Sequence, residues 1–271
     1  MAKNKISKRP LVSFFGLSYL IFLVLFSITG LGIVLGFPET VTNILQIVAA
    51  WSSTFAFLII FKRVFPEIEF WNFVKKQFQE KIKASTIITV VLLQLIIFGL
   101  VIVLPGTGLK ISLSFSGLGI LLFHFINNLI RGSLGEELGW RGFAQKELQK
   151  KHSPLVSSLI IGALWGFWHA PLWLVSGYKG IDLIQYIIVF LLGIISISII
   201  ISLFYNLSGN LIIPIIIHQL FNFLVVITSG ELLITLTYTC LSYFVLAVIL
   251  IAVNPRELLY EGSSGNKSVE V

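Results

Sequence analysis

The sequence has one cysteine, and only 11% of its 271 residues are charged. Cys240 alone excludes an intrachain disulfide, a thiolate metal site and a Cys-based redox pair. Asp182 is the only aspartate, which excludes a catalytic aspartyl dyad. None of the four histidines is followed by glutamate, so the H-E-x-x-H helix of zinc proteases is also excluded.

Apolar residues make up 56% of the chain, and the mean hydropathy is +0.98. Repeated long apolar runs of this kind predict an all-α, polytopic membrane protein. We expect about eight transmembrane helices, over residues 11–37, 41–61, 85–104, 118–130, 155–175, 184–205, 211–228 and 232–253, the fourth of which runs on into the segment that carries Glu136. Residues 66–83 combine a regular apolar stripe with a basic face, which predicts one interfacial amphipathic helix.

The basic residues predict how the chain is oriented. With the N-terminus in the cytoplasm, every Lys and Arg except Lys110 and Lys179 falls on the cytoplasmic side. We therefore predict a multi-pass protein of the cell membrane with both termini cytoplasmic, whose partner is the lipid bilayer and not nucleic acid. Residues 1–10 form a basic tail, residues 11–255 form one membrane-embedded domain with a motif core at 118–225, and residues 256–271 form a polar tail.

Two adjacent acids, Glu136 and Glu137, stand beside these apolar runs. Acidic residues are costly near hydrocarbon and are usually functional there. Glu137 and Arg141 are four residues apart with the acid first, which favours an ion pair on one helix face. Glu136 points about 100° away and stays free to act. The alternative is a membrane-border helix with two solvated acids.

Two further segments carry polar side chains within apolar runs. His169 lies in the fifth predicted span, four residues after Trp165. His218 and Asn222 are four residues apart in the seventh and share a helix face. The alternatives are a satisfied core histidine and an interhelical hydrogen-bond clamp.

Together these groups are the parts of a water-activating hydrolase. Glu136 can take a proton from water and return it to a leaving amine, while His169 holds the same water. His218 and Asn222 can donate hydrogen bonds to the oxyanion that develops on a peptide carbonyl. Glu137 and Arg141 would brace the first helix.

A metal-based mechanism stays open. Glu136, His169 and His218 are also a plausible Zn²⁺ ligand set with an open position for water, so the protein is either zinc-dependent or metal-independent. The depth of these groups is a second open question, because Glu136 ends the fourth span while His169 lies about 21 Å into the fifth. Either the fifth helix begins in the cytosol, or Gly132 and Gly135 break the fourth helix.

The pattern Glu136-Glu137-x-x-x-Arg141, aromatic-x-x-x-His169 and His218-x-x-x-Asn222 resembles the CPBP family of CAAX-processing and bacteriocin-processing intramembrane proteases. The one departure is Trp165, where the family usually has Phe. The resemblance implies that Glu136 is the catalytic carboxylate, that His169 is its partner on the water, and that His218 and Asn222 form the oxyanion or metal-side pair.

The resemblance also implies the substrates. Family members cut membrane-associated peptides or proteins near the cytoplasmic face: prenylated tails in eukaryotes, and peptides linked to maturation and bacteriocin self-immunity in bacteria. The main alternative is a non-enzymatic immunity factor or regulatory scaffold of the same fold. A proton-relaying transporter is disfavoured because the apolar pattern has no internal repeat. Every polar position of the pattern is filled, which favours the enzyme.

Overall fold

Apolar helices make up nearly all of the chain that the computed structural model describes, which is residues 9–104, 108, 110–111 and 117–259. Four of them are long and apolar enough to cross a membrane: α2 (Pro10–Val34), α6 (Ala84–Val103), α12 (Gly180–Ser208) and α14 (Leu232–Val253). Two shorter apolar helices are α10 (Pro154–Trp168) and α13 (Ile212–Ile227). The one strand pair in these residues joins β1 (Lys110–Ile111) antiparallel to β2 (Thr228–Ser229), with Lys110 opposite Ser229.

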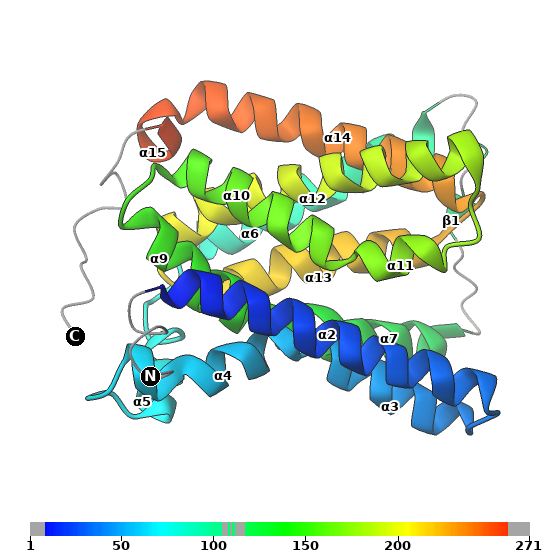
Figure 1. Cartoon of the computed structure of the whole chain (residues 1–271). Coiled ribbons are helices and arrows are strands. Elements are labelled where there is room, and N and C mark those ends of the chain that lie inside the picture. Colours follow the sequence, from blue (N-terminus) through cyan, green and yellow to red (C-terminus); the bar gives the residue numbers. More distant parts are fainter. Residues whose placement is uncertain (1–8, 105–107, 109, 112–116, 260–271) are drawn as a thin grey trace.

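Helix α12 is the most buried of the four long helices, and it packs against α10, α13 and α14. Helix α2 packs on the other side of the bundle against α3 (Glu39–Ala50) and α4 (Ser52–Val64) (Figure 1). Many leucine, isoleucine and valine side chains remain exposed on the outer helix faces, as a lipid-facing surface requires. The prediction of an all-α, polytopic membrane protein is confirmed.

The predicted second span is not one straight helix. It is broken at Trp51 into α3 and α4, which are bent by 48° relative to each other. Counting this pair as one span gives five candidate membrane spans in the described residues. The remaining predicted spans are helical but shorter or interrupted. In the fifth predicted span, for example, α10 ends at Trp168, and α11 (Ala170–Leu174) follows after a turn at His169.

The fourth predicted span runs on through the Glu136 segment, as expected, and continues to Gln149. Helical turns run without interruption through α7 (Leu118–Asn128), η2 (Leu129–Ser133), α8 (Leu134–Glu137), η3 (Leu138–Gln145) and α9 (Lys146–Gln149). The segments η2 and η3 are π-helical.

This continuity answers the question of depth. Glu136 lies about 20 Å before the end of α9, and His169 lies about 22 Å after the start of α10, at 1.5 Å per residue. Because α10 begins soon after α9 ends, both residues reach similar depth. The continuous helical segment from α7 to α9 therefore does not break at Gly132 or Gly135.

The predicted interfacial helix is also shorter than expected, because α5 spans only Phe70–Lys76. Beyond it, the backbone carbonyl of Gln77 accepts from the Leu211 N–H, and the buried Gln77 side chain contacts Lys146 and Tyr205. Tertiary hydrogen bonds thus replace further helical turns.

At the C-terminal end, α15 (Pro255–Leu259) continues the fold and buries Leu258. The rest of the predicted polar tail, 260–271, and residues 1–8 of the basic tail lie outside the described residues. Helices α5, α9 and α15 gather at one end of the bundle, and β1 and α11 lie toward the other (Figure 1).

Candidate active site

The bend between α3 and α4 holds the helix that carries Glu136. Side chains at the bend donate to three of its carbonyls: Trp51 Nε1 to Ile130 (2.8 Å), Thr54 Oγ1 to Gly135 (2.7 Å) and Ser53 Oγ to Glu136 (3.3 Å). The π-helical segments η2 and η3 lie on either side of the turn that carries Glu136. In a π-helix each backbone N–H bonds to the carbonyl five residues earlier, and such turns are frequent at functional sites. Two glycines permit the close approach, because a Cβ on Gly135 would lie 2.5 Å from the Trp51 ring and one on Gly139 would lie 2.7 Å from the Ser53 carbonyl oxygen.

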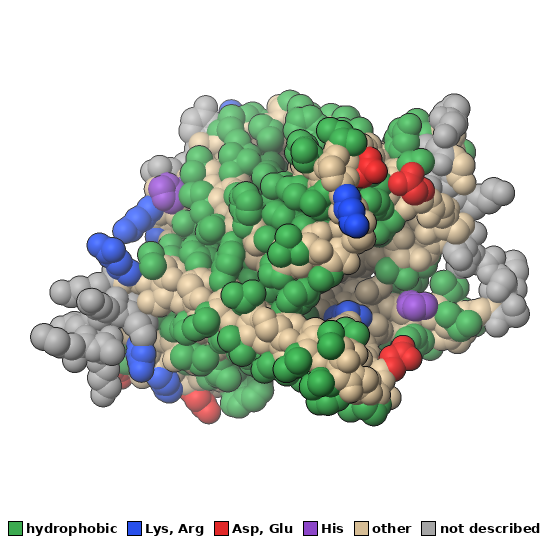
Figure 2. Space-filling model, turned by 45° about the vertical axis from the view of Figure 1, so that its right-hand side comes forward, with side chains coloured by type: hydrophobic (Ala, Val, Ile, Leu, Met, Phe, Trp, Pro, Cys, Tyr) green, Lys and Arg blue, Asp and Glu red, His purple; other side chains and the backbone are tan. Residues whose placement is uncertain are grey.

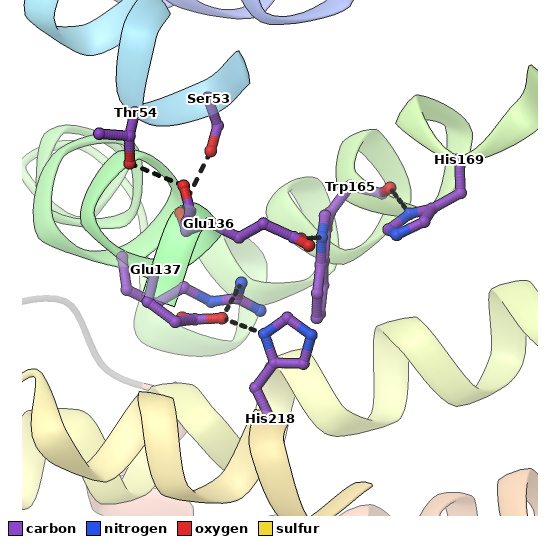
Figure 3. A network of polar contacts seen from close by, with 9 residues as sticks. Ser53, Thr54, Glu136, Glu137, Trp165, His169 and His218 are labelled. Carbon is purple, nitrogen blue, oxygen red and sulfur yellow. Dashed lines mark hydrogen bonds and ion pairs between the residues drawn. The ribbon is translucent and has the colours of Figure 1, made fainter. Parts of the chain in front are cut away.

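The Glu136 carboxylate is buried, and its two oxygens have different surroundings. Oε2 accepts a hydrogen bond of 2.6 Å from the indole N–H of Trp165 on α10 (Figure 3). Oε1 lies 3.9 Å from the point where a Cβ on Gly132 would stand. One oxygen is therefore fixed, and the other faces the space beside Gly132.

Two more predicted residues meet at that space. The Gly132 Cβ position lies 3.0 Å from Asn222 Nδ2 and 3.8 Å from His218 Nε2. Glu136, His218 and Asn222 thus converge on one point from two separate helical segments, and glycine leaves that point empty of side chain. This is the juxtaposition that the sequence pattern predicts.

Glu137 does more than the predicted brace. Its Oε1 accepts from Arg141 Nη1 at 3.1 Å, as the spacing predicts, and it also lies 2.7 Å from His218 Nδ1. All three side chains are buried. With Nδ1 donating to Glu137, His218 Nε2 can donate to a substrate only when the ring is doubly protonated.

His169 approaches the same region from the end of α10. Its Nδ1 lies 2.7 Å from the Trp165 carbonyl oxygen, which can only accept, so Nδ1 carries a proton. In the neutral ring, Nε2 is then the acceptor that can hold a water molecule. His169 and Glu136 line one cavity of about 460 Å³ together with Asn222.

Trp165 is the residue whose role the sequence did not predict. Its indole N–H anchors Glu136, its ring lies under the Arg141 guanidinium at 4.2 Å, and its carbonyl orients His169. Its ring also meets the His218 ring edge-on at 4.8 Å. The signal was present, because Trp165 is the one departure from the family pattern, and phenylalanine lacks the N–H that Glu136 accepts.

The predicted metal ligands are not gathered as a set. Among the residues that the structure describes, no three His, Cys, Asp or Glu side chains are close enough together to hold a metal ion. The Nδ1 atoms of His169 and His218 already have partners in Trp165 and Glu137. The side chains as placed do not fit the ion, and Zn²⁺ binding by Glu136, His169 and His218 stays a prediction.

The fold and the site together define a polytopic helical membrane protein with a buried acid, histidine and amide centre. Comparison with known proteins gives the family resemblance. Residues 118–224 match the family described as type II CAAX prenyl endopeptidase, Rce1-like. That segment contains all six predicted site residues: Glu136, Glu137, Arg141, His169, His218 and Asn222.

A second comparison agrees with the first. The chain is 31% identical over 162 residues to CAAX prenyl protease 2 of Methanococcus maripaludis, an alignment that covers 56% of this chain and 60% of that relative. The chain therefore matches less than two thirds of the relative's length. The resemblance to CAAX-processing endopeptidases is confirmed over the motif-bearing core.

Proposed function

We propose that this protein is an intramembrane endopeptidase that hydrolyses a peptide bond with a water activated by Glu136 and His169. The observation that carries the proposal is the convergence of Glu136 Oε1, His218 Nε2 and Asn222 Nδ2 on the space beside Gly132. His169 reaches the same cavity. A carboxylate, an imidazole acceptor and two potential oxyanion donors are thereby within reach of one substrate carbonyl.

The reaction uses groups of this chain throughout. Glu136 Oε1 takes a proton from the water that His169 Nε2 orients, and the water oxygen bonds to the substrate carbonyl carbon. Asn222 Nδ2 and the doubly protonated His218 ring donate to the resulting oxyanion. The C–N bond then breaks, and Glu136 returns its proton to the leaving amine. Glu137, Arg141 and Trp165 hold these groups in place without touching the substrate.

The substrate class follows from the site's location and from the relatives. The site lies among apolar helices, so the substrate is a membrane-associated peptide or protein, and the relative's name supports a prenylated CAAX tail. Exposed lysines and arginines at the end of the bundle that carries α5 and α9 support cytoplasmic termini and cutting near the cytoplasmic face in the cell membrane.

The test is cleavage of a farnesylated CAAX-type peptide by the purified protein in detergent. We expect Glu136→Gln and His169→Ala to lower kcat at least 100-fold while thermal unfolding stays close to wild type. Unchanged cleavage by Glu136→Gln protein would refute the assignment. The same preparations, analysed by mass spectrometry for bound Zn²⁺ and assayed after chelation, test the metal prediction directly.

A further inference from the structure

Arg131 lies in the same cavity as Glu136, in the π-helical segment η2. The charge pattern alone places it with the basic residues that flank membrane spans. The structure instead puts it in the interior of the continuous helical segment, about 20 Å after Leu118 and about 27 Å before Gln149 at 1.5 Å per residue. A guanidinium at such a position is costly, and residues of this kind usually serve a ligand or a partner.

The described residues offer Arg131 no counter-charge. None of their carboxylates lies within ion-pair distance of its guanidinium, whereas Arg141 is paired with Glu137. The cavity lining otherwise consists mainly of apolar side chains, and its polar members include the amides of Gln46 and Asn128. Figure 2 shows a face of the molecule that is hollowed between apolar side chains.

The spacing of Arg131 and Glu136 relates this charge to the chemistry. They are five residues apart, Arg131 in the π-helical segment η2 and Glu136 in the α-helical turn α8 that follows, and both line the same cavity. Their backbones are separated by about 7 Å along the helix. Extended peptide residues advance about 3.3–3.6 Å each, so a few of them cover the separation of the two backbones.

We propose that Arg131 is an anion subsite that binds the free C-terminal carboxylate of the peptide substrate. A planar guanidinium with no partner in an apolar cavity matches a carboxylate in charge and in its two-pronged geometry. The subsite selects peptides whose scissile bond lies close to a free C-terminus. It rests on the proposed peptidase function and names the feature of the substrate that the same cavity recognises.

The experiment compares two forms of one peptide: a farnesylated CAAX-type peptide with a free C-terminal carboxylate, and the same peptide ending in an amide. The full chain, purified in an uncharged detergent, is assayed as wild type and as Arg131→Gln. The matched control is Arg63→Gln, because Arg63 is an exposed arginine on α4, away from the cavity. Wild type and Arg63→Gln should favour the free acid at least tenfold in kcat/KM. Arg131→Gln should cleave the acid as slowly as the amide, with amide cleavage unchanged.

Two results would overturn the subsite. One is a wild-type protein that cuts acid and amide equally well. The other is an Arg131→Gln protein that slows both peptides equally, because that shows a structural or transition-state role. A parallel series adds phosphatidylglycerol and measures thermal unfolding. If the lipid stabilises wild type but not Arg131→Gln, and if wild type shows no preference for the acid peptide, the occupant of the subsite is a lipid phosphate and not a peptide carboxylate.

A binding assay separates failure of the subsite from failure of the peptidase. Fluorescence anisotropy of a dansyl-labelled acid and amide pair is measured on Glu136→Gln protein, which cannot cut by the proposed mechanism. At least tenfold tighter binding of the acid, lost when Arg131→Gln is added, supports the subsite even if wild type cleaves neither peptide. Equal binding of the two peptides rejects it, whatever the cleavage assay gives.

Discussion

Replacing Trp165 with phenylalanine isolates the hydrogen bond that fixes Glu136. The substitution keeps an aromatic ring for Arg141 but removes the N–H that donates to Glu136 Oε2 at 2.6 Å. A hydrogen bond to a charged group contributes about 1.5–3 kcal/mol. If that energy holds Oε1 toward the substrate, its loss lowers kcat by about 10- to 100-fold.

The kinetic pattern distinguishes positioning from folding. Because Trp165 does not touch the substrate in the proposed mechanism, KM should change less than threefold while kcat falls. The matched control is Trp173→Phe, since the buried Trp173 N–H has no acceptor among the described residues. Peptide cleavage is followed by chromatography and mass spectrometry, and thermal unfolding reports the folded fraction. Full activity of a folded Trp165→Phe protein would show that Glu136 needs no such anchor.

Three other substitutions test separate parts of the structure. Gly132→Ala should abolish cleavage, because its methyl group fills the space beside Glu136 and pushes Asn222 Nδ2 aside, whereas Gly99→Ala, whose new methyl group meets nothing within 4 Å, should keep full activity. Retained activity of Gly132→Ala would contradict the proposed position of the substrate carbonyl. Glu137→Gln removes the charge that pairs with the buried Arg141 guanidinium and should cost about 3–5 kcal/mol of stability. Glu147→Gln, which loses a pair with an exposed lysine, should cost about 1 kcal/mol or less. Equal melting temperatures for the two variants would contradict this. Burial lowers the pKa of Lys146 from 10.5 to about 8. Between pH 8 and pH 10.5 the unfolded chain therefore binds more protons than the folded protein, and the melting temperature should rise with pH across that window. An equal rise in the Lys146→Met variant would show that Lys146 is not the cause.

The apolar pattern was sufficient to predict the helical class and the order of the helices. Runs of apolar residues long enough to cross a bilayer have few alternatives to helix, because backbone groups in lipid must be satisfied within the segment. The i,i+4 spacing likewise predicted the ion pair of Glu137 and Arg141 and the convergence of His218 with Asn222. Both predictions depend only on local helix geometry, which sequence spacing encodes directly.

Contacts between distant segments were not predictable in the same way. The bend at Trp51 and the early end of α5 both arise where side chains or carbonyls find partners far along the chain, such as Ile130 for Trp51 and Leu211 for Gln77. Hydropathy records how apolar a segment is, but it does not record which carbonyl a tryptophan or glutamine will meet. These elements were therefore predicted as longer, simpler helices than the structure contains.

The two π-helical segments explain why the acids were placed at the end of a span. The fourth span was predicted to run on into the Glu136 segment and to end near Glu136, yet η2 and η3 are part of a helix that continues to Gln149. Arg131 and Gly132 in the π-helical segment η2 and Glu136 in the α-helical turn α8 line one cavity. A hydropathy pattern does not show how far the helix continues past Glu136, and the cavity beside this helix is the one that the proposed chemistry uses. Polar residues just beyond an apolar run can therefore belong to the interior of a longer, irregular helix.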